Sequence, residues 1–576
     1  MASKPSWQYY KTLADMSHVR ALAESAFNTR SAGGGPKVIT ASEAYEAACQ
    51  MPWVTVTDLP MYEGAVKSLG LKPGAKVLND NHGGTVGRSA EARVFYNRVS
   101  KSEQDALELL LREAIYKMQC NHELVIAEGV IGTHPDMMLK ARLLAPKEDA
   151  MNMFNWMANF QPLHATPEYE SSKPLDIPDI LFVAYPEWTS DDPRWDRGCV
   201  VVDEIHMTIF NLGLRYFGER KKGTLTMAWT AGMRLGAVAA HGGIKEIDFS
   251  ECQEFKSRGK QVIAFYGLSG SGKSSHTNSL DNEGTLPEGF KRRIAHDDAF
   301  QIDYKNKKCY VWEPSLFDKT DSRELDHPDW QYCISTQNML TVEVDGKILP
   351  YGRDTRNNNG RAIFRRELLG ETTNVIGFPN SLGWLMKDTT LPPILKIKSL
   401  DLSVAMGATL MTKRTAAENV SQKEMAELVF IPFANPFRVY KLYRDCEGYE
   451  EVFKSGCECY VWTGGGAGFW KSSDEDTWAI PLETSLTLQT AILTGVLEWE
   501  DWDLIPGAQI PTKETVDKIL PGYYNMYNPA SVQNREKYLA TIKSRFKQRI
   551  NFLKESDLKE RPELLERLVK ALEIKV

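Results

Sequence analysis

The eight residues from Gly267 to Ser274 carry the clearest chemical signal in this sequence. They read Gly-Leu-Ser-Gly-Ser-Gly-Lys-Ser and match the phosphate-loop pattern G-x-x-x-x-G-K-[ST] in full. In such a loop the glycines let backbone N–H groups face phosphate oxygens, the lysine reaches the β- and γ-phosphates, and the final hydroxyl binds Mg²⁺. A glycine-rich turn with a solvated lysine is the alternative. The apolar, β-prone stretch 262–266 in front of the loop favours the phosphate site.

Two aspartates stand at the end of the next apolar segment. Residues 293–296 read Arg-Ile-Ala-His and lead into Asp297-Asp298. An acidic pair alone is more often a surface turn. Acidic residues after a strand, in a chain that also has a phosphate loop, are typical of a metal site. We therefore predict that this pair takes part in binding a divalent cation.

Other polar residues are ambiguous when taken singly. Adjacent lysines such as Lys221-Lys222 are usually solvated, although a phosphate loop in the same chain favours a phosphate role for them. A single histidine such as His241 is more often structural, and an arginine such as Arg88 more often forms a surface ion pair. The second glycine-rich stretch, 463–468, is a weak signal for which a flexible turn is the default.

The bulk composition sets limits on the class of protein. The chain has 576 residues, enough for several domains, with 42% hydrophobic and 25% charged residues, as in ordinary globular proteins. The net charge of −7 argues against a general nucleic-acid or membrane surface. Nine cysteines without a C-x-x-C spacing predict no disulfide framework, and we see neither a signal peptide nor a transmembrane stretch. We expect a cytoplasmic protein that binds neither nucleic acid nor membrane.

The elements that must position these residues follow from periodicity. Residues 1–50 are expected to be helical with a break at 33–36. The segment 102–119 has the spacing of a helix whose apolar face includes Leu107, Leu110, Leu111 and Ile115. Residues 180–184 and 200–202 are typical of buried strands, and 530–576 predicts a pair of helices.

Taken in order, these segments resemble the ATP-dependent phosphoenolpyruvate carboxykinases. The resemblance rests on seven segments that match family motifs and span most of the chain, including 510–512 near its end. They are Gly87-Arg88-Ser89, Tyr216–Gly223, His241, Gly267–Ser274, Asp297-Asp298, Asp354-Thr355-Arg356 and Thr463–Thr477. The combination is far more specific than any single motif, and the phosphate loop is similar to that of the ATP class, not the GTP class.

The resemblance implies a reaction and a set of site residues. The family converts oxaloacetate and ATP to phosphoenolpyruvate, ADP and CO₂ through a metal-stabilised enolate. By resemblance the catalytic residues are Arg88, Tyr216, Lys221, Lys222, Ser269, Lys273 and Arg356. Metal ligation falls to Lys222, His241 and Asp298 for Mn²⁺ and to Ser274 and Asp297 for Mg²⁺. Nucleotide binding falls to Gly267, Leu268, Ser269, Gly270, Ser271, Gly272, Lys273, Ser274, Ser275, Lys471 and Thr477.

The implied fold is a two-lobed α/β carboxykinase fold with a P-loop nucleotide-binding domain. Residues 1–240 would form the N-terminal substrate lobe and 241–576 the C-terminal nucleotide lobe, with the active site between them and a mobile lid near 406–419. The implied partners are oxaloacetate, phosphoenolpyruvate, CO₂ and nucleotide. The protein would be a monomer or a small homo-oligomer.

Several positions depart from the family pattern. Ser274 replaces threonine, Gly242-Gly243 follow His241 in place of Cys-Ser, and different residues follow Asp298 and Arg356. Lys471 replaces an arginine, and lysine is a point charge without the planar fork that grips phosphate or stacks on a base. These departures leave three other functions open. They are a divergent P-loop kinase, a carboxykinase that uses pyrophosphate, and a nucleotide-binding regulatory protein without turnover.

Overall fold

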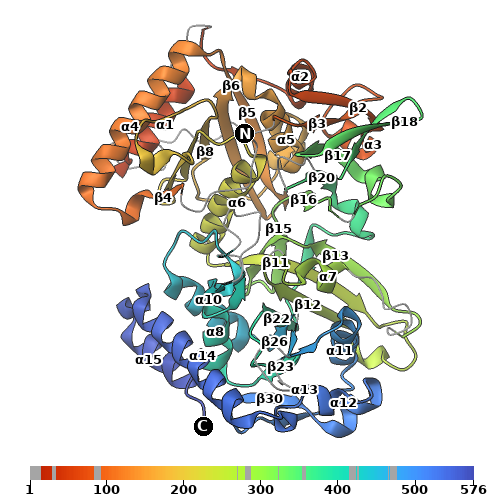
Figure 1. Cartoon of the computed structure of the whole chain (residues 1–576). Coiled ribbons are helices and arrows are strands. Elements are labelled where there is room, and N and C mark those ends of the chain that lie inside the picture. Colours follow the sequence, from red (N-terminus) through yellow and green to blue (C-terminus); the bar gives the residue numbers. More distant parts are fainter. Residues whose placement is uncertain are drawn as a thin grey trace. The chain divides into compact units, whose positions relative to one another are not determined.

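The computed structural model of the chain is a mixed α/β protein with several sheets (Figure 1). It describes residues 15–28, 34–82, 92–268, 270–278, 287–321, 323–352, 359–413, 423, 427–464, 466–467 and 477–575. In their described parts these residues form two compact units, one of 1–231 and 311–368, the other of 232–310, 369–415 and 422–576. The α/β class expected from the sequence is confirmed.

The first unit contains two main sheets. Eight described strands form one, in the order β1 (Lys37–Val38), β5 (Leu124–His134), β6 (Met137–Pro146), β8 (Ile180–Tyr185), β10 (Thr208–Leu212), β9 (Cys199–Asp203), β4 (Arg93–Phe95), with β7 (Gln161–Pro162) beside β5. The other runs β16 (Ser315–Lys319), β20 (Arg361–Arg365), β17 (Cys333–Gln337), β3 (Lys76–Asp80), β2 (Val54–Pro60). A hairpin of β18 (Leu340–Val344) and β19 (Lys347–Tyr351) accompanies them.

Helices cover these sheets, and α4 shows why they form where they do. The helices are α1 (His18–Asn28), α2 (Ala41–Ala48), α3 (Glu63–Ser68), α4 (Lys101–Asn121), α5 (Ala150–Asn159) and α6 (Phe217–Arg234). Ser100 and Glu103 form a reciprocal capping box at the start of α4. Leu107, Leu111 and Ile115 are buried against the core, as their spacing predicted.

The second unit is organised around one large sheet. Its strands run β21 (Val375–Gly377), β15 (Lys308–Val311), β14 (Ala299–Asp303), β11 (Val238–Asp248), β12 (Lys260–Tyr266), β22 (Ser381–Met386), β26 (Glu458–Thr463), β23 (Ile394–Ile397), β30 (Ala508–Pro511), β29 (Trp499–Asp501), with β13 (Lys291–His296) beside β11. Short pairs are β24 (Met411–Lys413) with β25 (Leu428–Phe430), and β27 (Gly466–Ala467) with β28 (Trp478–Ala479).

At the centre of this sheet β12, β22 and β26 are parallel neighbours. Their carboxyl ends therefore lie at one edge, where ligands bind in open α/β sheets. The helices of the unit are α7 (Lys273–Asn278), α8 (Leu400–Ala408), α10 (Leu442–Lys454), α11 (Leu482–Thr494), α12 (Lys513–Ile519), α13 (Tyr523–Tyr527), α14 (Arg535–Glu555) and α15 (Pro562–Ala571). The last two confirm the helical pair predicted for the C-terminal segment. Helices α10 and α15 both pack on α8 (Figure 1).

The expected lobes, 1–240 and 241–576, stay a prediction. The compact units differ from them because 311–368 belong with the N-terminal part of the chain. The lid also stays a prediction. Of its expected range, 406–408 end helix α8 and 411–413 form β24, with Met406 and Met411 buried, while 414–419 lie outside the described residues.

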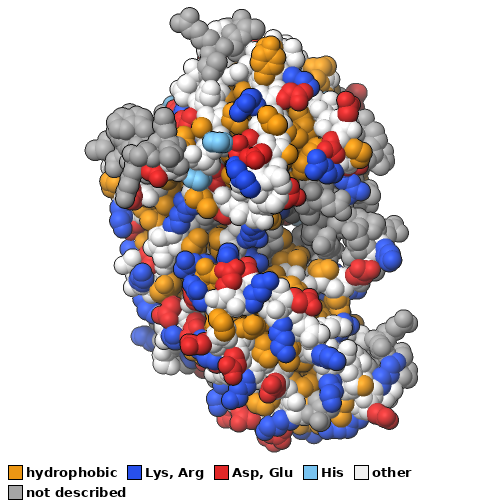
Figure 2. All heavy atoms as spheres, turned by 90° about the vertical axis from the view of Figure 1, so that its left-hand side faces the viewer, with side chains coloured by type: hydrophobic (Ala, Val, Ile, Leu, Met, Phe, Trp, Pro, Cys, Tyr) orange, Lys and Arg blue, Asp and Glu red, His pale blue; other side chains and the backbone are white. Residues whose placement is uncertain are grey.

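The described surface and helices agree with the composition. On the face drawn in Figure 2, Lys and Arg side chains are interspersed with Asp and Glu side chains. Among the described residues, no helix has both the length and the apolar character needed to cross a membrane.

Candidate active site

The phosphate-loop sequence follows a buried strand and opens a helix, as predicted. Strand β12 ends at Tyr266, and α7 begins at Lys273. Residues 262–266 of the strand are buried. This buried part of the strand is apolar because a central strand with both faces covered has no polar side to present.

The backbone of the loop needs its glycines. Gly270 and Gly272 have φ of 81° and 96°, values that side chains disfavour. Ser271 closes a turn, with its N–H and its hydroxyl both donating to the carbonyl of Leu268 at 3.0 and 2.7 Å. A Cβ on Gly267 would lie 2.1 Å from Ser271 Oγ, so only glycine fits there. A loop of this kind lets backbone N–H groups approach an anion.

Three predicted site residues meet beside this loop. Lys273 Nζ lies 3.0 Å from Asp298 Oδ1, and the same oxygen lies 3.3 Å from His241 Nε2. All three side chains are at most 18% exposed. Strand β11 supplies His241, helix α7 supplies Lys273, and the turn between β13 and β14 supplies Asp298. The second unit therefore brings the phosphate lysine and two predicted metal ligands together.

The geometry of His241 suits metal binding. Its Nδ1 lies 2.5 Å from the carbonyl oxygen of Ala434. A carbonyl only accepts, so Nδ1 donates to it, and in a neutral ring Nε2 would be an acceptor facing a carboxylate oxygen. Two facing acceptors are satisfied by a cation shared between them, and a backbone partner on the other nitrogen is usual for metal-bound histidine. An imidazole nitrogen with a carboxylate oxygen fits Mn²⁺.

The neighbouring aspartate is held by the phosphate-loop helix. Asn278 Nδ2 donates to Asp297 Oδ2 at 3.0 Å. Buried His296 fixes the acidic turn, because its Nδ1 accepts from the backbone N–H groups of Asp298 and Ala299 at 3.0 and 3.1 Å. Among the described residues, no group of three or more His, Cys, Asp or Glu side chains forms a ready metal-ligand cluster. A metal here therefore needs other donors, such as Ser274, water or phosphate.

Strand β11 also supports the phosphate-loop helix. His241, Gly243 and Lys245 alternate along the strand, so they share one face. A Cβ on Gly243 would lie 2.0 Å from Thr277 Oγ1, and the buried Lys245 donates to the carbonyl of His276 at 2.6 Å. The glycine that departs from the family pattern therefore lets α7 pack directly on the strand that carries His241.

The remaining residues of the loop segment differ in exposure. Ser274 is exposed and Ser275 half-buried, so the Ser274 hydroxyl is accessible to a hydrated cation. Thr477 directly precedes β28 and is half-buried.

The first unit holds the predicted residues of the Tyr216–Gly223 segment. Tyr216 is buried, with its ring 6.0 Å from that of Phe317. In α6, Lys221 is buried and forms an ion pair with Glu313, Nζ to Oε1 2.9 Å. The Nζ of Lys222 lies 5.8 Å from the centre of the Trp229 ring. That ring contact favours the charged amine, whereas a metal ligand must be neutral, so metal binding by Lys222 has to overcome it.

Other predicted residues lie outside the described part of the chain. They are Arg88, Ser269, Arg356 and Lys471. The sequence analysis did not single out two described residues that lie near predicted site residues. Glu313, the partner of Lys221, is 92 positions away along the chain and carries no motif. Lys387 at the end of β22 likewise has no local signal.

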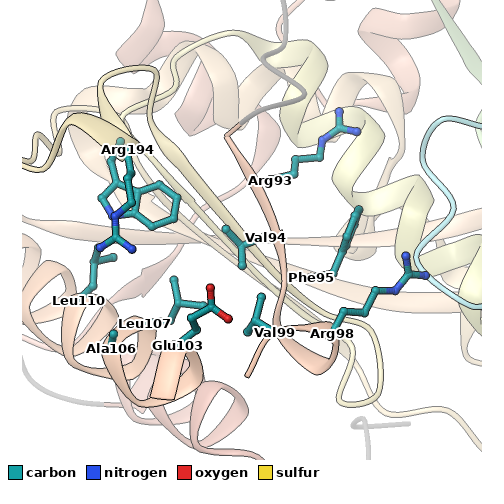
Figure 3. A pocket seen from close by; sticks show the side chains of 11 residues that line it. Arg93, Val94, Phe95, Arg98, Val99, Glu103, Ala106, Leu107, Leu110 and Arg194 are labelled. Atoms are coloured by element: carbon teal, nitrogen blue, oxygen red, sulfur yellow. The ribbon is translucent and has the colours of Figure 1, made fainter. Parts of the chain in front are cut away.

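A separate cavity of about 380 Å³ lies in the first unit. Figure 3 shows Val94, Val99, Leu107 and Glu103 around its centre, with Arg194 at its edge. Glu103 is already engaged in the cap of α4. Of the predicted site residues that the structure describes, none lines this cavity.

The chain is similar to proteins of known family over much of its length. The chain is 22% identical over 403 residues to "Phosphoenolpyruvate carboxykinase (ATP)" of Dictyostelium discoideum. That match covers 66% of this chain and 66% of the relative's own length. Residues 87–518, which include the phosphate loop, the acidic pair and His241, match the family described as phosphoenolpyruvate carboxykinase. The chain belongs to the phosphoenolpyruvate carboxykinase family.

Proposed function

We propose that this protein is a phosphoenolpyruvate carboxykinase that reversibly converts oxaloacetate and ATP to phosphoenolpyruvate, ADP and CO₂. The observation that carries the proposal is the meeting of Lys273, Asp298 and His241 beside a phosphate loop. The family of the chain and the ATP-specific name of its relative support the same reaction.

The reaction places definite demands on the site. Cleavage of the bond between C3 and the C4 carboxylate of oxaloacetate releases CO₂, and the electron pair stays behind as an enolate. The enolate oxygen then attacks the γ-phosphorus, and the bond between that phosphorus and the bridging oxygen breaks to leave ADP. Catalysis therefore requires positive charge near the enolate and the transferring group, alignment of donor and acceptor, and exclusion of water.

On the substrate side, Arg88 would bind a carboxylate through its planar pair of donors, and Tyr216 would lie beside the end that leaves as CO₂. Ser269 would orient the substrate oxygens. Lys221 and Arg356 would neutralise the transferring phosphoryl group. The ion pair with Glu313 holds the Lys221 amine in place, which supports a role that depends on preorganised charge.

On the nucleotide side, the backbone of the phosphate loop and Lys273 would bind the β- and γ-phosphates. Ser274 and Asp297 would hold Mg²⁺, with Ser275, Lys471 and Thr477 completing the nucleotide site. His241 and Asp298 would hold Mn²⁺ together with Lys222. When bound, Mn²⁺ would supply the positive charge that stabilises the enolate.

The identity of the phosphoryl donor has a specific alternative. Lys471 stands where an arginine is usual, so a donor without a base to grip, such as pyrophosphate, remains compatible with this site. A panel of ATP, GTP and pyrophosphate with oxaloacetate, in the wild type and in Lys471→Arg, separates these donors. Strict ATP preference that restoring the arginine leaves unchanged would show that Lys471 does not set donor choice.

A substrate test distinguishes the proposed reaction from the alternative functions. Purified protein is incubated with ATP, Mg²⁺ and Mn²⁺, with and without oxaloacetate, and ADP and CO₂ are measured together. We expect ADP and CO₂ only when oxaloacetate is present. ADP formation without CO₂ would favour a kinase with another acceptor. ATP binding without turnover would favour a regulatory nucleotide-binding protein.

Cell location and assembly complete the proposal. Sparse cysteines and the absence of a disulfide framework in the sequence support a cytoplasmic location, and we expect a monomer or small homo-oligomer.

A further inference from the structure

Three parallel strands of the second unit end beside one another at the phosphate site. Strand β12 leads into the phosphate loop, its neighbour β22 ends at Met386 directly before Lys387, and β26 ends at Thr463 directly before Gly464. The carboxyl edge of a parallel sheet is where ligands of open α/β folds bind. Lys387 therefore stands at the ligand-binding edge, one strand from the loop.

The position of Gly464 shows how close the phosphate loop lies to this lysine. A Cβ built on Gly464 would lie 3.3 Å from the carbonyl oxygen of Ser271 and 3.6 Å from Lys387 Nζ. The loop and the lysine thus face one gap about as wide as a side-chain atom, and glycine leaves that gap open. The backbone around it is fixed, since Gly464 N–H donates to Met386 O and Lys387 N–H donates to Met411 O, both at 2.9 Å.

The charge of Lys387 is poorly compensated. Its side chain is half-buried, and burial together with the nearby Lys413 lowers its pKa. Among the residues that the structure describes, none supplies a carboxylate to its amine. A partly desolvated ammonium without a counter-ion gains strongly from an anion, and the anion expected at this edge is a phosphate group.

We propose that Lys387 is a second phosphate-binding lysine of this site, which pairs with oxygens of the terminal phosphates of a nucleoside triphosphate or of pyrophosphate. It would act together with Lys273 of the phosphate-loop segment. The positive charge of Lys387 would also compensate for the weaker phosphate binding that is expected of Lys471 in comparison with an arginine. The inference rests on the proposed use of a polyphosphate donor and adds a residue that the family motifs do not contain.

Direct binding measurements test this role without requiring turnover. Dissociation constants for ATP, inorganic pyrophosphate and adenosine are measured by calorimetry for the wild type, Lys387→Met and Lys387→Arg. The matched control is Lys398→Met, an exposed lysine on the same unit whose Nζ lies 3.9 Å from Asp501 Oδ1. Loss of one charge-assisted contact should weaken ATP and pyrophosphate binding by about 10-fold or more in Lys387→Met. Adenosine binding should not change, and Lys387→Arg should restore most of the affinity.

Three outcomes would overturn the proposal. They are unchanged ATP and pyrophosphate affinity in Lys387→Met, an equal loss in the Lys398→Met control, or an equal loss of adenosine binding in Lys387→Met. Lys387→Gln keeps the test decisive if the Met variant does not fold, with the same expected losses. Turnover of oxaloacetate by the wild type, measured on the same preparation, reports separately on the proposed reaction.

Discussion

Lys273 Nζ lies 3.0 Å from Asp298 Oδ1, so the lysine predicted to bind phosphate is paired with an aspartate predicted to bind a metal. Each group serves as the counter-charge of the other. In the proposed reaction a nucleotide would bring phosphate to Lys273 and a cation would reach Asp298. Both groups would then gain new partners, and the direct ion pair would no longer be needed. Binding of nucleotide and of metal should therefore be linked.

Replacing Lys273 by methionine separates these two roles. The variant removes the positive charge at the β- and γ-phosphates, so phosphoryl transfer should fall by about 10³-fold or more. Binding of Mn²⁺, followed by electron paramagnetic resonance, should be kept or strengthened because a competing cation beside Asp298 is gone. Lys291→Met, which alters an exposed ion pair with Glu251, is the control. Turnover close to wild type in Lys273→Met would remove the phosphate loop from the mechanism.

His241 should be required for a second metal. Its Nε2 faces Asp298 while Nδ1 is held by the carbonyl of Ala434, so His241→Ala removes an oriented donor. We expect Mn²⁺ affinity to fall by about 10-fold or more and the Mn²⁺ concentration needed for activity to rise. His327→Ala, a histidine of the first unit, should change neither. Full activity with Mg²⁺ alone that does not change in His241→Ala would contradict this assignment.

Gly243 should be essential for the position of the phosphate-loop helix. Alanine at this site collides with Thr277, so α7 has to shift, and a strain of about 1–3 kcal/mol is expected. The affinity for ADP should fall in Gly243→Ala. It should recover in part in Gly243→Ala/Thr277→Gly, which removes the colliding atoms at a helix-propensity cost of roughly 0.3 kcal/mol.

Gly377→Ala is the matched control for this pair. Its new Cβ would have Val262 Cγ2 at 3.6 Å as its nearest neighbour, an ordinary contact. Wild-type ADP affinity in Gly243→Ala, or failure of the double variant to recover any affinity, would show that the contact does not position the helix.

The sequence predicts the parts of the site that local pattern determines. The strand before the phosphate loop, the helix after it and the strand before Asp297-Asp298 all follow from short stretches with a strong signal, and the structure confirms them. Helix α4 is also confirmed, because both its cap and its apolar face lie within one stretch. The family resemblance added His241, whose type alone predicted only a structural histidine.

The rest depends on contacts between distant segments. Lys221 was predicted to act on phosphate, but its partner Glu313 becomes visible only when α6 packs beside the segment that follows β15. Gly243 departs from the family pattern, and its reason is visible only in the fold, where α7 packs against it. Lys387 lies near the phosphate loop only because β22 pairs with β12. No short stretch of the sequence contains both partners of any of these contacts.

A buried carboxyl in the first unit predicts a pH dependence of stability. Burial raises the pKa of Asp80 from 3.8 to about 6, although Gln337 donates to its carboxylate. The folded protein therefore holds this proton more tightly than the unfolded chain. Stability should fall as pH rises from about 4 to about 6, by an amount on the order of 3 kcal/mol at most, and then level off.

In Asp80→Asn the free energy of unfolding should not show this fall with pH. The asparagine amide oxygen can still accept a hydrogen bond from Gln337, and the side chain carries no charge. Urea unfolding of the full chain from pH 4 to 8 measures the difference, with Asp105→Asn as an exposed control. A wild-type profile parallel to that of Asp80→Asn across this range would contradict the assignment.

Product balance tests the central claim most directly. Purified protein is supplied with oxaloacetate, ATP, Mg²⁺ and Mn²⁺, and phosphoenolpyruvate, ADP and CO₂ are quantified in the same reaction over time, with Lys273→Met as the blank. The account predicts equal amounts of all three products, and formation of oxaloacetate from phosphoenolpyruvate, ADP and CO₂ in the reverse direction. Release of CO₂ without phosphoenolpyruvate, or ADP without either, would contradict it.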